Sequence, residues 1–141
     1  MPARPPSRED LVAALALQDP GAAPGEDVLA QLALAVAAAA APDRGALRTA
    51  CRALAQELAA RVPGRTVELR VPPYAAVQCV PGPRHTRGTP PNVVEVQPLA
   101  WVHLAVGDLT WADAARDGRL AASGERSDLS EHLPLVRMSG R

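Results

Sequence analysis

The chain has 141 residues, which fits one domain and leaves little room for a second complete one. Fifteen arginines, with no lysine, balance fifteen acidic residues, and a formal net charge of zero argues against a binder of nucleic acids or anionic membranes. Three aromatic residues are too few for a platform that stacks single-stranded bases, and the hydrophobic content of 48% is too high for a disordered chain.

The first part of the chain predicts three helices. Serine and aspartate side chains suited to helix N-caps precede runs of apolar residues with helical spacing. In the third helix, one apolar face should pack on the rest of the domain, and it carries Leu47, Cys51, Leu54 and Leu58. The expected helices begin after Ser7, Asp27 and Asp43 and end near Leu17, Pro42 and Val62.

The second part of the chain changes from a helical period to the period of a strand. Val67, Leu69 and Val71 alternate with charged residues, which predicts a half-buried strand, and Pro72 should end it. A last helix should begin at Ser127 or Asp128 and hold Leu129 and Leu133. Further strands are expected at 75–80, 92–96 and around 120–122, further helices at 98–106 and 111–117, and a loop at 81–91.

The cysteines and the longest apolar run indicate the cellular compartment in which the protein is expected. Cys51 and Cys79 are too few for a disulfide framework and lack the spacing of a redox or zinc site, so both are expected to be reduced core residues. The alanine-rich run 32–41 is too short to span a bilayer and follows acidic residues, so we expect no integral membrane segment. The simplest location is the cytoplasm.

A glycine-punctuated segment near the C-terminus carries the clearest motif. In residues 107–125, glycine closes one helix, Thr110 begins the next, and a Gly-Arg-Leu step turns the chain into a strand. This segment resembles the C-terminal signature of the sterol carrier protein family, and the blocks 71–79 and 82–92 resemble a small bacterial branch of that family. The matching positions are Gly107, Leu109, Ala114, Gly118, Arg119, Leu120 and Gly124, with Glu125 in place of the usual acid.

The resemblance covers about residues 43–137 and implies an α/β (α+β) fold. The family fold is a curved mixed sheet of about five strands, covered by helices on one face, with an apolar cavity between sheet and helices. Residues 1–42 would then be an N-terminal extension, a tail plus two extra helices. Ala115 stands where family members usually carry phenylalanine, so we expect space beside Ala115 with the Trp111 indole at its edge. The same leucines and valines would equally form a closed core.

The candidate ligand site combines a polar loop with residues that would line this cavity. Arg84, His85 and Arg87 lie in the predicted loop, where two guanidiniums and an imidazole could hold a carboxylate or phosphate head group. The alternative is a rigid loop whose side chains hydrogen-bond their own backbone and pair with nearby acids. The cavity residues of the predicted set are Trp101, Trp111 and Ala115.

Three functions from different classes remain open. Binding or carriage of a lipid or another apolar small molecule is favoured, ahead of a non-enzymatic protein-interaction domain and of an enzyme that uses His85 as acid–base on an amphipathic substrate. The sequence has no Walker-type loop, nucleophile elbow, zinc-protease motif or dinucleotide fingerprint, so neither a cofactor nor a metal is expected. The expected partner is an apolar or amphipathic small molecule and not a nucleic acid, and nothing in the sequence indicates a protein partner or an oligomer.

Overall fold

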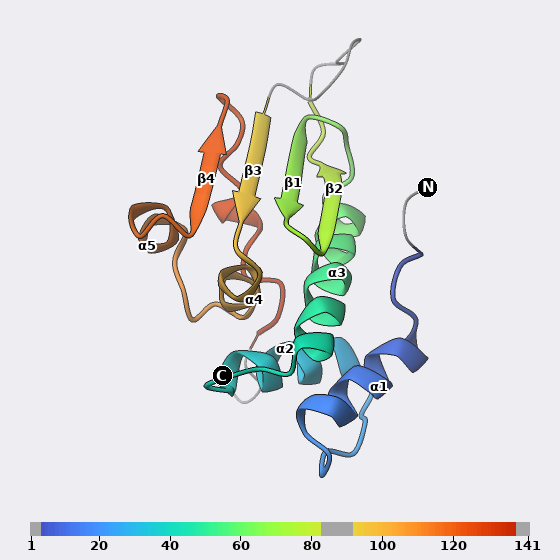
Figure 1. Ribbon diagram of the computed structural model, residues 1–141. Coiled ribbons are helices and arrows are strands. Elements are labelled where there is room, and N and C mark those ends of the chain that lie inside the picture. The colour runs from blue at the N-terminus through green and yellow to red at the C-terminus, as the bar shows by residue number, and fades with distance from the viewer. Residues whose placement is uncertain (1–3, 83–91, 138–141) are drawn as a thin grey trace.

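The computed structural model describes residues 4–82 and 92–137, and most of the predicted 81–91 loop lies outside these ranges. In chain order, helices cover the N-terminal part and a mixed set of strands and helices follows (Figure 1). The elements are α1 (Arg8–Gln18), α2 (Val28–Ala38), α3 (Arg44–Arg61), β1 (Val67–Val71), β2 (Ala75–Cys79), β3 (Asn92–Val96), α4 (Pro98–Val106), α5 (Trp111–Arg116), β4 (Leu120–Ser123) and the 3-10 helix η1 (Ser130–His132).

The three N-terminal helices begin where their capping residues predict. Ser7 and Asp10 form a capping box at the start of α1, in which the Ser7 backbone N–H donates to Asp10 Oδ2 at 2.8 Å. Asp27 accepts the Ala30 N–H of α2 at 3.0 Å, and Asp43 accepts the Ala46 N–H of α3 at 2.9 Å. Each cap satisfies a backbone donor that the helix itself leaves unpaired, so these starts follow from local chemistry.

The described strands form one mixed sheet in the order β2-β1-β3-β4. β1 pairs antiparallel with β2 and parallel with β3, so Leu69 lies between Val77 and Val94, and β3 pairs antiparallel with β4. Because side chains alternate along a strand, the valines and Leu69 of β1 share one buried face with Val94 and Val96, while Glu95 is exposed on the other face. The predicted mixed α+β fold is confirmed, with four strands in the described chain where about five were expected.

Helices cover the buried face of the sheet. In Figure 1, α3 runs behind β1 and β2, and α4 packs beside α3. The face of α3 that was predicted to be buried is buried at Cys51, Leu54 and Leu58, whereas Leu47 is only half-buried. The orientation assigned to this helix from its apolar spacing is therefore confirmed.

The extra N-terminal helices are also confirmed, and they pack on the helical layer rather than on the sheet. Both α1 and α2 contact α3, and α2 also contacts α4. Leu32 and Val36 of α2 are fully buried, so the alanine-rich stretch that follows them carries little of the contact. The boundary between segments 1–42 and 43–137 stays a prediction. No helix within residues 4–82 and 92–137 is both long enough and apolar enough to span a membrane.

The predicted last helix is wrong in type and length. The chain forms only the single 3-10 turn η1, with Leu129 fully buried just before it and Leu133 half-buried just after it. Asp128 Oδ1 accepts the Ser130 N–H at 2.9 Å, which closes a local turn, and Pro134 follows too soon for a helix to continue. The segment after this turn docks on α4 instead, through hydrogen bonds from the N–H groups of Leu135 and Val136 to the Ala105 carbonyl.

Candidate functional site

The residues predicted to bind a ligand do not come together within the described chain. Arg84, His85 and Arg87 fall in the segment 83–91, outside the described residues, so their proposed head-group role stays a prediction. Trp101 is fully buried in the core, where its indole Nε1 donates to the Cys51 carbonyl at 3.3 Å.

Two further predicted residues lie on the short helix α5. Trp111, its first residue, is half-buried and packs against the edge of the core, while Ala115 is exposed. Ala114, the neighbour of Ala115, is the residue of α5 that is buried. None of Trp101, Trp111 and Ala115 lines the grooves described below.

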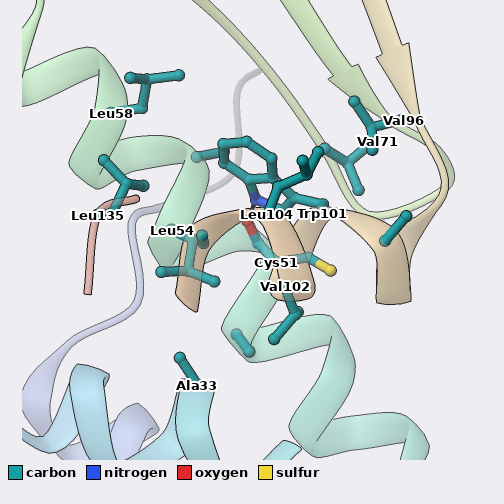
Figure 2. Close-up of a cluster of buried hydrophobic side chains, with 14 of the residues drawn as sticks. Ala33, Cys51, Leu54, Leu58, Val71, Val96, Trp101, Val102, Leu104 and Leu135 are labelled. Atoms are coloured by element: carbon teal, nitrogen blue, oxygen red, sulfur yellow. Dashed lines mark hydrogen bonds between the residues drawn. The ribbon is translucent and has the colours of Figure 1, made fainter. Parts of the chain in front are cut away.

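The space between the helices and the sheet is occupied by side chains. Figure 2 shows the Trp101 ring between Leu54 and Leu58 of α3 on one side and the valines of the sheet on the other. Leu104 of α4 and Leu135 of the C-terminal segment extend the same cluster. The predicted apolar cavity stays a prediction, and the three concave surfaces that follow, formed by residues within 4–82 and 92–137, are grooves open to solvent.

The first of these surfaces, here called the hairpin groove, lies between α3 and the β1–β2 hairpin. Its volume is about 470 Å³, and most of its lining is apolar. Two guanidinium groups stand among the apolar side chains, Arg52 from α3 and Arg70 from β1. The groove is lined by Pro6, Arg52, Gln56, Arg70, Pro72, Pro73, Tyr74, Ala75, Ala76 and Val77.

Local chemistry fixes the shape of the hairpin groove. Pro72 and Pro73 end β1 and have restricted backbone angles, and the Tyr74 N–H donates to the Val71 carbonyl at 2.8 Å to close the turn. The antiparallel pairing of β1 with β2 then places the turn and the edge strand beside α3. The apolar wall is therefore built before any ligand arrives, which lowers the ordering cost of binding.

A second surface, here called the seam groove, runs along the contact between α1 and α3 and has a volume of about 320 Å³. Both helices contribute residues at helical spacing, so each presents one stripe to the groove. The charged lining residues are three arginines and one aspartate. The groove is lined by Arg4, Pro6, Asp10, Ala13, Ala14, Leu17, Gly45, Arg48, Thr49 and Arg52.

Arg52 belongs to both grooves and is held by the N-terminal segment. Its Nη2 donates to the Arg4 carbonyl oxygen at 2.5 Å, and Arg4 in turn lies 3.4 Å from Asp10. Hydrogen bonding to Ser7 lowers the pKa of Asp10, and the positive charges of Arg4 and Arg52 act in the same direction. Asp10 is therefore ionised at neutral pH.

The two cations of the hairpin groove differ in their pairing. Arg70 donates through Nε and Nη2 to the same Glu68 oxygen, at 3.1 and 2.7 Å, so its charge is compensated. Within residues 4–82 and 92–137, no carboxylate lies within 4.0 Å of the Arg52 or Arg48 guanidinium. Among the described arginines that line the hairpin and seam grooves, Arg48 and Arg52 are therefore the two without a carboxylate partner.

A third groove, of about 660 Å³, lies between α1, α2, α3 and the C-terminal segment. Its apolar lining includes Leu29 and Val136, but its cations are already engaged. Arg61 donates to Glu57 Oε2 at 2.6 Å, and Arg8 donates to the Gly25 and Glu26 carbonyls. Its lining carries three acids, Glu26, Asp27 and Glu57, against these two arginines, so the charge of this groove does not favour an anionic head group.

The two cysteine thiols, which are the potential nucleophiles of the core, are buried. Burial raises the pKa of Cys51 to about 12 and that of Cys79 to about 11, so both thiols stay protonated and unreactive at neutral pH. Both are free cysteines in the core, as the sequence predicts. In the described part of the chain, no three His, Cys, Asp or Glu side chains are grouped so that they could hold a metal ion.

The fold and the glycine-rich segment 107–125 together indicate a sterol-carrier-like domain. The sequence model of the family described as "Bacterial SCP ortholog" matches residues 43–135. Because this match covers more than half of the chain, the protein belongs to the sterol carrier protein family. No curated protein sequence matches the chain.

The sequence did not indicate that the α3 arginines border these grooves. Arg48 and Arg52 follow a regular helical spacing on the polar side of α3, which is typical of a solvent-exposed face. Their neighbours across the grooves come from α1 and the β1–β2 hairpin, which no local pattern connects to α3. The sequence signal for the hairpin groove was the pair of prolines before Tyr74, which indicates a rigid turn but does not indicate that α3 lies beside it.

Proposed function

We propose that the protein binds an amphipathic, lipid-like small molecule and that the apolar chain of this ligand lies in the hairpin groove. The observation that carries the proposal is the groove itself, about 470 Å³ of mostly apolar surface that is lined, apart from Pro6, by residues of the family-matched part of the chain. Small-molecule sites usually have volumes of about 300–1,000 Å³ and are lined by apolar side chains with a few polar groups. Membership of the sterol carrier protein family supports the same class of ligand.

The lining of the hairpin groove suits an alkyl chain. Tyr74 and the adjacent prolines offer flat, rigid apolar surfaces, and Val77 adds an aliphatic side chain from the edge strand. An alkyl chain that covers these groups removes apolar area from water on both sides, at about 25 cal/mol per Å². Because the groove is open to solvent, the ligand can enter and leave while the core around Trp101 stays packed, as a carrier requires.

Filling the groove tests this proposal. Ala76 is an exposed residue of β2 that lines the hairpin groove, so Ala76→Trp should occupy the space of the alkyl chain. We expect dodecanoate to bind at least about tenfold more weakly to this variant, a loss of about 1.4 kcal/mol. Isothermal titration calorimetry measures the affinity.

Gln78→Trp is the matched control, because Gln78 is exposed two residues further along β2 and does not line the groove. This variant should bind dodecanoate as the wild type does. Equal affinities of the two tryptophan variants would remove the hairpin groove as the site. A wild-type protein that binds neither dodecanoate nor an uncharged alkyl ligand would favour the non-enzymatic interaction domain instead.

A further inference from the structure

We infer that Arg48 and Arg52 form an anion site in the seam groove, and that this site takes the carboxylate or phosphate head of the ligand whose chain lies in the hairpin groove. The inference rests on the proposed function and adds the chemical class of the ligand: a single-chain amphiphile with an anionic head. Neither arginine belongs to the loop that the sequence indicated for this role.

The two guanidinium groups are placed by one face of α3. Residues four apart lie one turn from each other on a helix, so Arg48 and Arg52 project from the same stripe, with the Thr49 hydroxyl beside them. The facing stripe of α1 supplies Ala13, Ala14 and Leu17. An anion in the seam groove therefore meets donors on one wall and, on the other, apolar surface with the Asp10 carboxylate at one end.

The charge in the groove favours an anion. Of its four charged residues three are arginines, and the single acid, Asp10, already accepts the Ser7 N–H and lies 3.4 Å from Arg4. Arg4 and Asp10 compensate each other, and the positive charges of Arg48 and Arg52 remain. Repulsion from Asp10 is offset by Arg4, so the site keeps a net attraction for a carboxylate or phosphate.

The present partner of Arg52 is one that an anion can replace. The Arg52 guanidinium donates to the neutral carbonyl of Arg4, and hydrogen bonds to a charged acceptor are roughly twice as strong as neutral ones. An anionic head bound to Arg52 would take over this donor. The N–H groups that Arg52 does not use toward Arg4 leave room for a second oxygen of the same head group.

The position of Arg52 connects the head-group site to the chain site. Arg52 and Pro6 line both the hairpin groove and the seam groove. The chain before α1 runs alongside α3 (Figure 1). Because Pro6 of this segment and Arg52 of α3 line both grooves, the two grooves meet at these residues. A ligand with its head at Arg48 and Arg52 can therefore extend its chain past Pro6 into the hairpin groove.

Charge-neutralising variants test the inference. We expect Arg52→Gln to bind dodecanoate and dodecyl phosphate about tenfold more weakly than wild type, while its affinity for methyl dodecanoate stays the same. Arg48→Gln, the second variant, should show the same selective loss. Isothermal titration calorimetry gives the affinities, and thermal unfolding verifies that each variant is folded.

Arg44→Gln is the matched control, because Arg44 is exposed on the same helix, carries the same charge and lines none of the three grooves. It should bind all three ligands as wild type does. Inorganic phosphate at millimolar concentration should not compete with dodecanoate, since the free anion lacks the apolar chain.

The outcomes separate this inference from the proposed function. Equal affinity of wild type for dodecanoate and its methyl ester would overturn the anion site and leave the apolar groove standing. The anion site would also be overturned if Arg52→Gln and Arg48→Gln weakened dodecanoate binding no more than Arg44→Gln does. Displacement of dodecanoate by inorganic phosphate would indicate that the seam groove binds free anions, and would contradict the inference that its ligand is an amphiphile. Absence of binding to every alkyl ligand would be a failure of the proposed function itself.

Discussion

Replacing Trp101 with alanine is expected to lower the free energy of unfolding by about 3–5 kcal/mol. The ring is fully buried at the centre of the domain, where it contacts both the helical layer and the sheet (Figure 2). Removing it would leave a cavity that the surrounding leucines and valines can only partly fill, and would also remove the hydrogen bond to the Cys51 carbonyl. Urea unfolding followed by circular dichroism measures the change.

Trp111→Ala is the control for this experiment. Trp111 is half-buried at the start of α5, so its truncation should cost clearly less than that of Trp101. A decrease in the free energy of unfolding below about 1 kcal/mol for Trp101→Ala would contradict the packed core and favour a ligand cavity around the indole. A larger decrease for Trp111→Ala than for Trp101→Ala would do the same.

Alkaline pH is expected to destabilise the protein through its two buried thiols. Both thiols have native pKa values, about 12 for Cys51 and about 11 for Cys79, above the ordinary value of 9.0. Above pH 9 the unfolded chain therefore loses the thiol protons while the folded chain keeps them. The contribution of the two thiols to the free energy of unfolding is fully present below pH 9. Above pH 9 the free energy of unfolding falls by about 1.4 kcal/mol per thiol for each pH unit, until the native pKa of that thiol is reached. Urea unfolding at pH 8, 9 and 10 measures this slope.

Removing each thiol isolates its contribution. Cys51→Ala and Cys79→Ala should each flatten the decline above pH 9 by about half. Each should lower the free energy of unfolding by a constant amount only below pH 9, where the thiols are protonated in both the folded and the unfolded chain. Tyr74 and the arginines are present in every variant, so their effects cancel in the comparison. A decline that is unchanged in both variants would show that the thiols are not the groups that ionise on unfolding.

The elements of the fold were predictable because their signals are local. The side chains of Ser7, Asp27 and Asp43 each accept a backbone N–H within the next three residues, so their helices begin where expected. Gly107 adopts a positive φ of 86°, a conformation that ends α4 at the glycine. The alternation in Val67–Val71 likewise decides which face of β1 is buried.

The short elements were harder to predict. The segment after Asp128 has the leucine spacing of a helix, but Pro134 and the docking of Leu135 on Ala105 limit it to one 3-10 turn. In α5, with six residues, the apolar period is too short to decide which alanine is buried, and the structure buries Ala114 rather than Ala115.

The grooves could not be predicted from the sequence because they depend on contacts between distant segments. Arg52 and the Arg4 carbonyl are 48 residues apart, and no local pattern indicates that they meet. Tyr74 lies beside α3 only because the β1–β2 hairpin folds over that helix. Arg84, His85 and Arg87 of the predicted 81–91 loop offer the same chemistry as the α3 arginines, but they lie outside the described residues. Only the tertiary arrangement shows that Arg52 borders an apolar groove.

Photoaffinity labelling with a dodecanoate analogue that carries a diazirine on its chain tests the central claim most directly. After irradiation, digestion and mass spectrometry, we expect the label on peptides of the hairpin groove, those containing residues 52–56 and 72–77, and we expect unlabelled dodecanoate to compete it away. Label concentrated on α5 around Trp111 and Ala115, or spread over the surface and unaffected by the competitor, would contradict a ligand chain bound between α3 and the β1–β2 hairpin.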